Sequence, residues 1–116
     1  MRKPAVPECG EVWSALLDPI VGHEQGGVRP ALVISNDAFN RLPHGLCIIA
    51  PITRTDRLLP TQLAIHAPDG GLRHDSIIMC DQLRAISVLR LRQRRGRVGQ
   101  ATLEAVQALV GLFIDR

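Results

Sequence analysis

The stretch HEQGGVRPALVIS, residues 23–35, joins a polar loop to a run of apolar, largely β-branched residues. Gly26 and Gly27 allow the loop to turn with positive φ and to approach a ligand closely. Pro30 disfavours the helical conformation at Arg29, so we expect Arg29 to be extended. Proline is tolerated at the first residue of a strand. The stretch therefore predicts a buried strand at residues 31–35 that begins just after an arginine.

Most of the remaining chain also has the pattern of short strands. Apolar or alternating runs bounded by turn residues predict strands at residues 11–17, 46–53, 62–66, 76–80 and 84–89. Asn36-Asp37 predicts the cap of a short helix over residues 38–40. Apolar residues at helical spacing predict a C-terminal helix over residues 100–114, with Gly99 as its cap. Residues 58–60, 69–72 and 93–99 are expected to be mobile loops.

These elements predict a mainly β fold with helices, of the α+β class. Short strands, many turns and one terminal helix favour a small, strongly bent antiparallel barrel with a C-terminal helix. The apolar stripe of that helix is wide for so small a core. We expect part of it to cover an opening in the sheet or a second copy of the chain.

Length and composition indicate one soluble cytoplasmic domain. A chain of 116 residues has no room for a second core. Cys9, Cys47 and Cys80 are odd in number and lack metal-ligand spacing. The last two lie in apolar runs, which favours reduced, buried thiols over a disulfide framework. No signal-peptide pattern opens the chain, and no run approaches the roughly 18 apolar residues of a membrane helix.

The loop before the strand predicted at residues 31–35 carries several residues suited to proton transfer and phosphate binding. Arg29 has little freedom to lose on binding a phosphate, or it pairs with a carboxylate and ties the loop to the barrel. His23 is a candidate proton-transfer residue, although most loop histidines are only solvated. Glu24 is either a surface charge or the partner of Arg29. Gln25 is a hydrogen-bonding residue that could read a base edge.

Polar residues also follow two of the predicted buried strands. Thr53 ends an apolar run, and alternation places it on the face of Cys47 and Ile49. Its hydroxyl then either emerges at the mouth of the barrel or simply terminates the strand. Asp81 follows a second apolar run and could orient a histidine, cap a turn or pair with Arg84.

The most basic stretch of the chain lies before the C-terminal helix. Five of the eight residues from Arg90 to Arg97 are arginine. They could follow a nucleic-acid backbone, dock an acidic partner or form a solvated loop. The sequence has no GxxxxGK[ST] loop, no zinc pattern such as HExxH or CxxC, and no GxSxG elbow. We therefore expect neither a metal nor an organic cofactor.

GHEQGGVRPALVIS, residues 22–35, resembles the opening signature of the MazF/PemK (Kid) toxin family of endoribonucleases. DAFNR, APIT, DSIIMCDQLRAI and the terminal helix follow in the order of that family. The resemblance covers the chain from about Gly10, which gives an N-terminal extension at residues 1–9 and one MazF/PemK-like domain at residues 10–116. It implies an SH3-like barrel, a homodimer and a cytoplasmic toxin, with a cognate antitoxin whose acidic, disordered tail covers the same surface.

The resemblance also implies a reaction. Members of this family cleave single-stranded RNA, chiefly mRNA, at specific sequences and without a metal. The 2′-hydroxyl of the substrate attacks the adjacent phosphorus, which leaves a 2′,3′-cyclic phosphate and a 5′-hydroxyl. In MazF-like members the matching arginine and threonine are essential, and here they are Arg29 and Thr53. In PemK-like members catalysis is assigned to residues that match His23 and Asp81 and to an arginine, where this chain has Met79.

Proton affinity divides the roles among these residues. A guanidinium stays protonated at all physiological pH values, so Arg29 suits charge stabilisation and protonation of the leaving group rather than base catalysis. Glu24 or His23 is the candidate base. Thr53 is expected to hold a phosphate oxygen or the attacking hydroxyl, with Asp81 as an orienting residue. Gln25, Gln82 and Arg84 are expected to position the RNA.

Two other functions are compatible with a barrel of this kind. CcdB-like toxins share the fold and bind DNA gyrase without cleaving RNA, but they lack the GxEQxGxRP loop. Their functional end is a C-terminal Trp-Gly-Ile, whereas this chain ends in Phe-Ile-Asp-Arg. An SH3-like adaptor for proline-rich peptides needs an aromatic-lined groove. Trp13, Phe39 and Phe113 are the only aromatic residues of the chain, which excludes that function.

Overall fold

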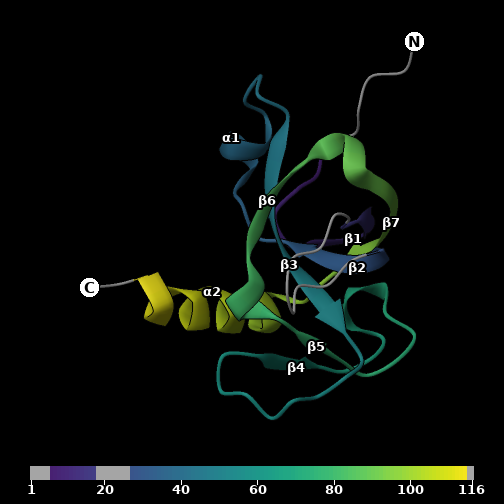
Figure 1. Cartoon of the computed structure of the whole chain (residues 1–116), viewed down its shortest axis with the longest axis vertical. Coiled ribbons are helices and arrows are strands. Elements are labelled where there is room, and N and C mark those ends of the chain that lie inside the picture. The colour runs from purple at the N-terminus through teal and green to yellow at the C-terminus, as the bar shows by residue number, and fades with distance from the viewer. Residues whose placement is uncertain (1–5, 18–26, 115–116) are drawn as a thin grey trace.

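The computed structural model describes residues 6–17 and 27–114, which form a seven-stranded antiparallel sheet with a C-terminal helix (Figure 1). The strands are β1 (Glu11–Leu16), β2 (Val28–Val33), β3 (Leu46–Thr53), β4 (Leu63–Ile65), β5 (Ser76–Ile78), β6 (Arg84–Ser87) and β7 (Leu91–Arg97). The helices are α1 (Asp37–Asn40) and α2 (Gln100–Ile114), and three 3₁₀ turns are η1 (Asp69–Gly71), η2 (Cys80–Gln82) and η3 (Val88–Arg90). No helix in this part of the chain is long and apolar enough to span a membrane.

β3 is the strand around which the sheet bends. The strand order is β4-β5-β3-β2-β1-β7, and β6 pairs with the first half of β3 while β5 pairs with its end. The sheet therefore has two partly separate halves that share one long strand. The strand pairings among the described residues do not close it into a complete barrel, although it curls strongly (Figure 1). The predicted α+β class and C-terminal helix are confirmed.

Alternate residues of the central strands pack into two different cores. The helix-side core holds even-numbered strand residues such as Val12, Leu32 and Ile52, together with Val106 of α2. The β6-side core holds odd-numbered strand residues, namely Ala15, Ala31, Val33, Cys47 and Ile49, together with Ile86 of β6. Because side chains of a strand alternate between its faces, both faces of the sheet are buried here.

The arginine-rich segment is a strand, and the expectation of a loop over residues 93–99 is wrong. β7 pairs with β1 from Glu11↔Arg97 to Ala15↔Leu91, with two register irregularities. Its residues show no apolar alternation, and β7 lies at an edge of the sheet, where a backbone ladder with β1 holds it. Side chains reinforce that ladder, since Glu11 accepts a hydrogen bond from Arg94 at 2.5 Å.

Other element boundaries differ from the predictions by a few residues. β2 begins at Val28 rather than at residue 31 and includes Pro30. This proline is tolerated because the ladder with β3 begins only at Ala31, so that β2 pairs with β1 alone at this position. Cys80 belongs to η2 rather than to the preceding strand. The predicted cap is confirmed, since Asn36 accepts a hydrogen bond from the backbone N–H of Phe39 at 2.9 Å.

The segment over residues 69–72, expected to be a loop, is packed against β7. Gly70 is buried, and Leu72 is only 5% exposed. Gly71 has φ +73°, and a Cβ there would lie 2.1 Å from the carbonyl oxygen of Arg95. Only glycine permits so close a crossing of η1 over β7. Asp69 also accepts hydrogen bonds from the N–H of Gly99, at 2.8 Å, and from Thr102, so it fastens the start of α2.

The cysteines behave as predicted, because none of the three forms a disulfide. Cys47 and Cys80 are fully buried, and burial raises the pKa of each thiol to about 11. For Cys80 the nearby charge of Asp81 raises the pKa further. These thiols are therefore protonated and inert in the folded protein.

Candidate active site

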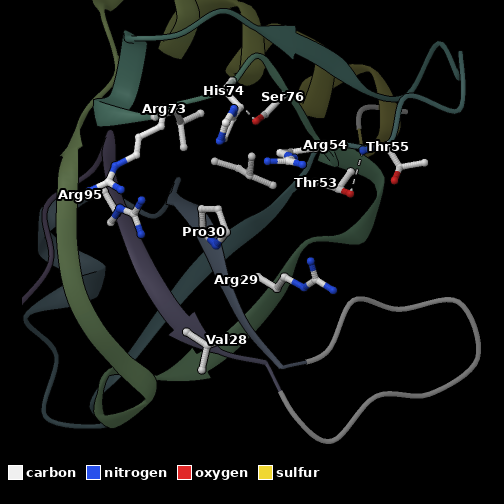
Figure 2. A pocket seen from close by; sticks show the side chains of 12 residues that line it. Val28, Arg29, Pro30, Thr53, Arg54, Thr55, Arg73, His74, Ser76 and Arg95 are labelled. Atoms are coloured by element: carbon white, nitrogen blue, oxygen red, sulfur yellow. Dashed lines mark hydrogen bonds between the residues drawn. The ribbon is translucent and has the colours of Figure 1, made fainter.

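A cavity of about 710 Å³ opens where β2 begins and β3 ends (Figure 2). Four segments contribute its walls: the start of β2, the end of β3 with the two residues after it, the segment from η1 to the start of β5, and β7. The lining residues are Val28, Arg29, Pro30, Ile52, Thr53, Arg54, Thr55, Leu72, Arg73, His74, Ser76 and Arg95. Ile52 and Leu72 belong to the helix-side core, so this cavity is built directly on packed apolar residues.

Strand register brings Arg29 and Thr53 together. β2 and β3 pair through Ala31↔Pro51, Leu32↔Ala50 and Val33↔Ile49. The ladder ends at Ala31↔Pro51; if its register is extended by two residues, Arg29 of β2 comes opposite Thr53 of β3. Paired residues of an antiparallel sheet present their side chains on the same face. Figure 2 shows both side chains on the rim of the cavity. The predicted positions at a strand entry and a strand end are therefore confirmed.

The hydroxyl of Thr53 is already oriented. Its Oγ accepts a hydrogen bond from the backbone N–H of Thr55 at 3.2 Å (dashed in Figure 2). A hydroxyl has one proton to donate in addition to its acceptor sites. With an acceptor site of the oxygen occupied by Thr55, the proton of Thr53 can be donated to a ligand in the cavity, such as a phosphate oxygen.

The lining of the cavity is strongly positive. Its described lining includes four arginines, namely Arg29, Arg54, Arg73 and Arg95, and no aspartate or glutamate. Arg54 makes no hydrogen bond or ion pair with any described residue, and Figure 2 shows its guanidinium pointing into the cavity. A guanidinium presents a planar set of donors that matches the oxygens of a phosphate. The cavity is thus suited to a phosphodiester.

Six polar lining residues fall outside the predicted site residues, although one of them, Arg95, belongs to the arginine-rich stretch considered for nucleic-acid binding: Arg54, Thr55, Arg73, His74, Ser76 and Arg95. Arg54 directly follows the APIT motif, so its position after a strand end is a usable signal. Arg73, His74 and Arg95 come from segments that only the tertiary structure brings to β2 and β3. His74 contributes an imidazole to the described lining, the group that proteins use most often in general acid–base catalysis. Figure 2 shows its ring pointing into the cavity.

Asp81, Gln82 and Arg84 do not line this cavity. The carboxylate of Asp81 accepts hydrogen bonds from Thr61 at 2.8 Å and from Gln62 at 3.4 Å. The side-chain oxygen of Gln82 is buried and has no partner among the described residues. Arg84 donates a hydrogen bond to the carbonyl oxygen of Leu17 at 3.0 Å, so it holds the residue that directly follows β1. Their roles toward RNA stay predictions.

Three predicted residues and Met79, the position at which PemK-like members have an arginine, remain to be placed. His23, Glu24 and Gln25 lie outside the described residues, so their roles stay predictions too. Met79 is 2% exposed and lies between β5 and η2, away from the cavity lining. No group of three or more histidine, cysteine or acidic side chains gathers as a metal site in residues 6–17 and 27–114.

Residues 8–114 match the family described as the PemK-like, MazF-like toxin of type II toxin–antitoxin systems. The chain belongs to this family. Endoribonuclease MazF9 of Mycobacterium tuberculosis is 35% identical over 111 residues, which cover 91% of this chain and 94% of that protein. Endoribonuclease EndoA of Bacillus subtilis is 43% identical over 83 residues, which cover 71% of this chain and 72% of EndoA.

Solved structures of PemK/MazF toxins share the fold. A crystal structure of MazF from Deinococcus radiodurans aligns with a TM-score of 0.84 at 27% identity, over 97% of this chain and 99% of that one. A crystal structure of MazE–MazF from the same organism aligns with a TM-score of 0.77 at 28% identity, over 95% and 96% of the two chains. These matches confirm the predicted architecture and the predicted family.

Proposed function

We propose that this PemK/MazF toxin is a sequence-specific endoribonuclease that cleaves single-stranded RNA, chiefly mRNA, in the cytoplasm. The relatives MazF9 and EndoA are named endoribonucleases. The observation that carries the proposal is the cavity that Arg29 and Thr53 line from two neighbouring strands, with four arginines and no carboxylate among its described lining residues. Such a lining suits the phosphates of RNA, and Arg29 and Arg54, at the end of the cavity that holds Thr53, suit the additional negative charge of the transition state.

The proposed reaction is an internal transesterification that uses no metal. The 2′-oxygen of one nucleotide forms a bond to phosphorus while the bond from phosphorus to the 5′-oxygen breaks. The proton of the 2′-hydroxyl passes to a base, and the 5′-oxygen leaves with a proton from an acid. The products are a 2′,3′-cyclic phosphate and a 5′-hydroxyl, so no water is consumed.

The residues of the cavity divide this work by their proton affinity. Arg29 and Arg54 stabilise the pentavalent phosphate, and Arg29 protonates the leaving oxygen. Thr53 donates its free proton to a phosphate oxygen. Glu24 or His23 acts as the base, and His74 is a further candidate within the described cavity. Asp81 acts indirectly by holding Thr61 and Gln62, while Gln25, Gln82 and Arg84 position the RNA.

Two protein partners complete the proposal. The homologous MazF of Deinococcus radiodurans has been solved with MazE. We propose that this chain likewise has a cognate antitoxin, whose acidic, disordered tail covers the positive cavity. We also propose a homodimer, because exposed apolar residues remain at the end of α2, where Leu112 is 77% and Ile114 is 76% exposed.

One experiment tests the proposed function directly. The purified protein is incubated with a long single-stranded RNA in EDTA, and the fragment ends are mapped. We expect 2′,3′-cyclic phosphate ends at one short motif. The Arg29→Ala variant is expected to cleave about 10²–10³-fold more slowly, because it loses a charge that stabilises the transition state. Circular dichroism and gel filtration check that this variant keeps its fold and its assembly.

Two results would count against the proposal. Cleavage by Arg29→Ala at a rate near that of the unmodified protein would overturn the assignment of Arg29. Intact RNA together with trapped DNA gyrase would instead indicate a CcdB-like toxin that binds gyrase and cleaves nothing.

A further inference from the structure

A second hollow continues the active-site cavity along β7. It has a volume of about 290 Å³ and is lined by Gly71, Arg73, Gln93, Arg94 and Arg95. Arg73 and Arg95 line both hollows. Figure 2 shows these two side chains close together at one end of the cavity, opposite to the end occupied by Thr53 and Thr55. We call Arg73 and Arg95 the bridging arginines.

Backbone packing fixes where the bridging arginines lie. A Cβ on Gly71 would lie 2.1 Å from the carbonyl oxygen of Arg95, and a Cβ on Gly96 would lie 2.8 Å from the backbone of Gly70. η1 therefore crosses β7 at backbone contact distance. Arg73 follows this crossing by two residues, so it is held beside Arg95. The pair is a product of tertiary structure rather than of sequence proximity.

The bridging arginines differ in their partners from two other arginines of β7, Arg94 and Arg97. Arg94 is an ion-pair partner of Glu11, with 2.5 Å between Nε and Oε2, and Arg97 pairs with Glu8. Arg95 donates only to the neutral hydroxyl of Ser14, at 3.0 Å. Arg73 forms no hydrogen bond or ion pair with any described residue. Within the described part of the chain, no carboxylate neutralises either of the bridging arginines.

We propose that Arg73 and Arg95 bind a phosphate of the RNA strand beyond the phosphate that is cleaved, so that the strand continues from the cavity into the second hollow. The inference rests on the proposed function. The site is positively charged and elongated, and successive phosphates are the repeated negative groups of a nucleic acid. The bridging arginines are positioning residues, because they lie at the far end from Thr53 and touch no reacting atom.

A positioning role makes a specific kinetic prediction. Loss of the contact between an arginine and a distant phosphate weakens binding of long RNA but leaves the rate of the chemical step unchanged. For Arg73→Gln and Arg95→Gln we expect KM to rise about tenfold, as for removal of a charge-assisted hydrogen bond, with kcat unchanged. The slope of log kcat/KM against log salt concentration should become shallower by about 0.7 for each phosphate that the variant no longer neutralises.

Arg92→Gln is the matched control. Arg92 lies on the same strand, is exposed, donates to the carbonyl oxygen of Leu89 at 3.0 Å and lines neither hollow. The substitution removes the same charge from β7 without touching the proposed path. Its salt slope is expected to equal that of the unmodified protein. Thermal unfolding of all three variants checks that the sheet is intact.

The phosphate itself can be located with neutral linkages. A methylphosphonate, placed between 2′-deoxynucleotides so that it cannot be attacked, is moved one position at a time away from the cleaved bond. The reference RNA has a phosphodiester between the same deoxynucleotides. At one position the unmodified protein should lose about tenfold in kcat/KM, and Arg73→Gln should lose nothing further there, because its interaction with that phosphate is already absent.

Each outcome separates this inference from the proposed function. If the unmodified protein cleaves RNA but the bridging variants keep the salt slope of Arg92→Gln, the inference fails and the proposed function stands. If the variants weaken binding of polyglutamate while cleavage of long RNA is unchanged, the hollow serves an acidic protein partner and the inference also fails. If the unmodified protein cleaves no RNA, the proposed function fails first.

Discussion

At the scale of single residues, the cavity combines two arginines and a threonine with one imidazole among its described lining residues. Arg29, Arg54 and Thr53 supply charge and a hydrogen bond, but none is a suitable base at neutral pH. His74 reaches the same cavity from the segment between η1 and β5. It therefore competes with His23 and Glu24 for the role of proton acceptor.

Replacing His74 by glutamine tests this role. If His74 takes the proton of the 2′-hydroxyl, His74→Gln should lower kcat about 10²-fold and leave KM nearly unchanged. The pH–rate profile of the variant should also differ in shape from that of the unmodified protein. The measurement is single-turnover cleavage of one short RNA at a series of pH values.

His66→Gln is the control for the histidine experiment. The side chain of His66 is 78% exposed, lies 3.5 Å from Asp75 and is absent from the cavity lining. The variant should cleave at the unmodified rate. If His74→Gln behaves in the same way, the base lies in the segment that carries His23 and Glu24.

The sequence could identify some of these residues but not all of them. Pro30 restricts Arg29 to an extended conformation, and the alternation of residues 46–53 places Thr53 at a strand end, so local rules find both. That both residues line one cavity depends on the register between β2 and β3. This register is set by which side chains pack into the cores. His74 has no local signature, because its position depends on a long-range crossing between η1 and β7.

At the scale of elements, the crossing of η1 over β7 leaves no space for a side chain at Gly71. Gly71→Ala adds a methyl group at φ +73° against the backbone of Arg95. We expect it to lower the free energy of unfolding by roughly 3 kcal/mol or more, since both backbone strain and overlap contribute. Urea denaturation measures the destabilisation.

Gly45→Ala separates strain from overlap. Gly45 has nearly the same conformation, with φ +68°, but a Cβ there would have nothing within 4 Å. The cost should then be only the roughly 1 kcal/mol of a left-handed residue. Equal destabilisation of the two variants would show that η1 does not press against β7 as described.

β7 shows why an element can be missed in a sequence. Prediction of strands relies on apolar alternation, whereas β7 reads LRQRRGR. Its stability comes from a backbone ladder with β1 and from side-chain hydrogen bonds to Glu11 and Ser14, which are about 80 residues earlier in the chain. In contrast, α2 and the central strands carry their periodicity in their own residues, so the sequence predicts them closely.

At the scale of the whole molecule, Glu11 links folding to pH. Burial raises its pKa, but hydrogen bonds from the N–H of Glu8, from Arg94 and from Trp13 outweigh burial and lower the pKa below 4.5. A carboxylate with a lowered folded pKa stabilises the protein above its unfolded pKa. That stability is lost as the pH falls through the folded pKa.

Glu11→Gln should therefore destabilise the protein by about 1–3 kcal/mol at neutral pH. The difference from the unmodified protein should shrink as the pH falls below 4.5. Thermal unfolding between neutral and acidic pH measures both effects. Glu8→Gln is the control, because Glu8 is half-exposed and its pair with Arg97 should contribute little. A difference for Glu11→Gln that does not change with pH would contradict this account.

The two cores on opposite faces of the sheet constrain how this toxin can diverge. An insertion of one residue within β1, β2 or β3 would exchange the side chains of both cores at once, so the scaffold resists changes in length. The segments that border the cavity, such as residues 54–62, are tied to neither core along most of their length. Related toxins can therefore acquire new target sequences through longer segments at the border of the cavity, while the two cores of the sheet stay unchanged.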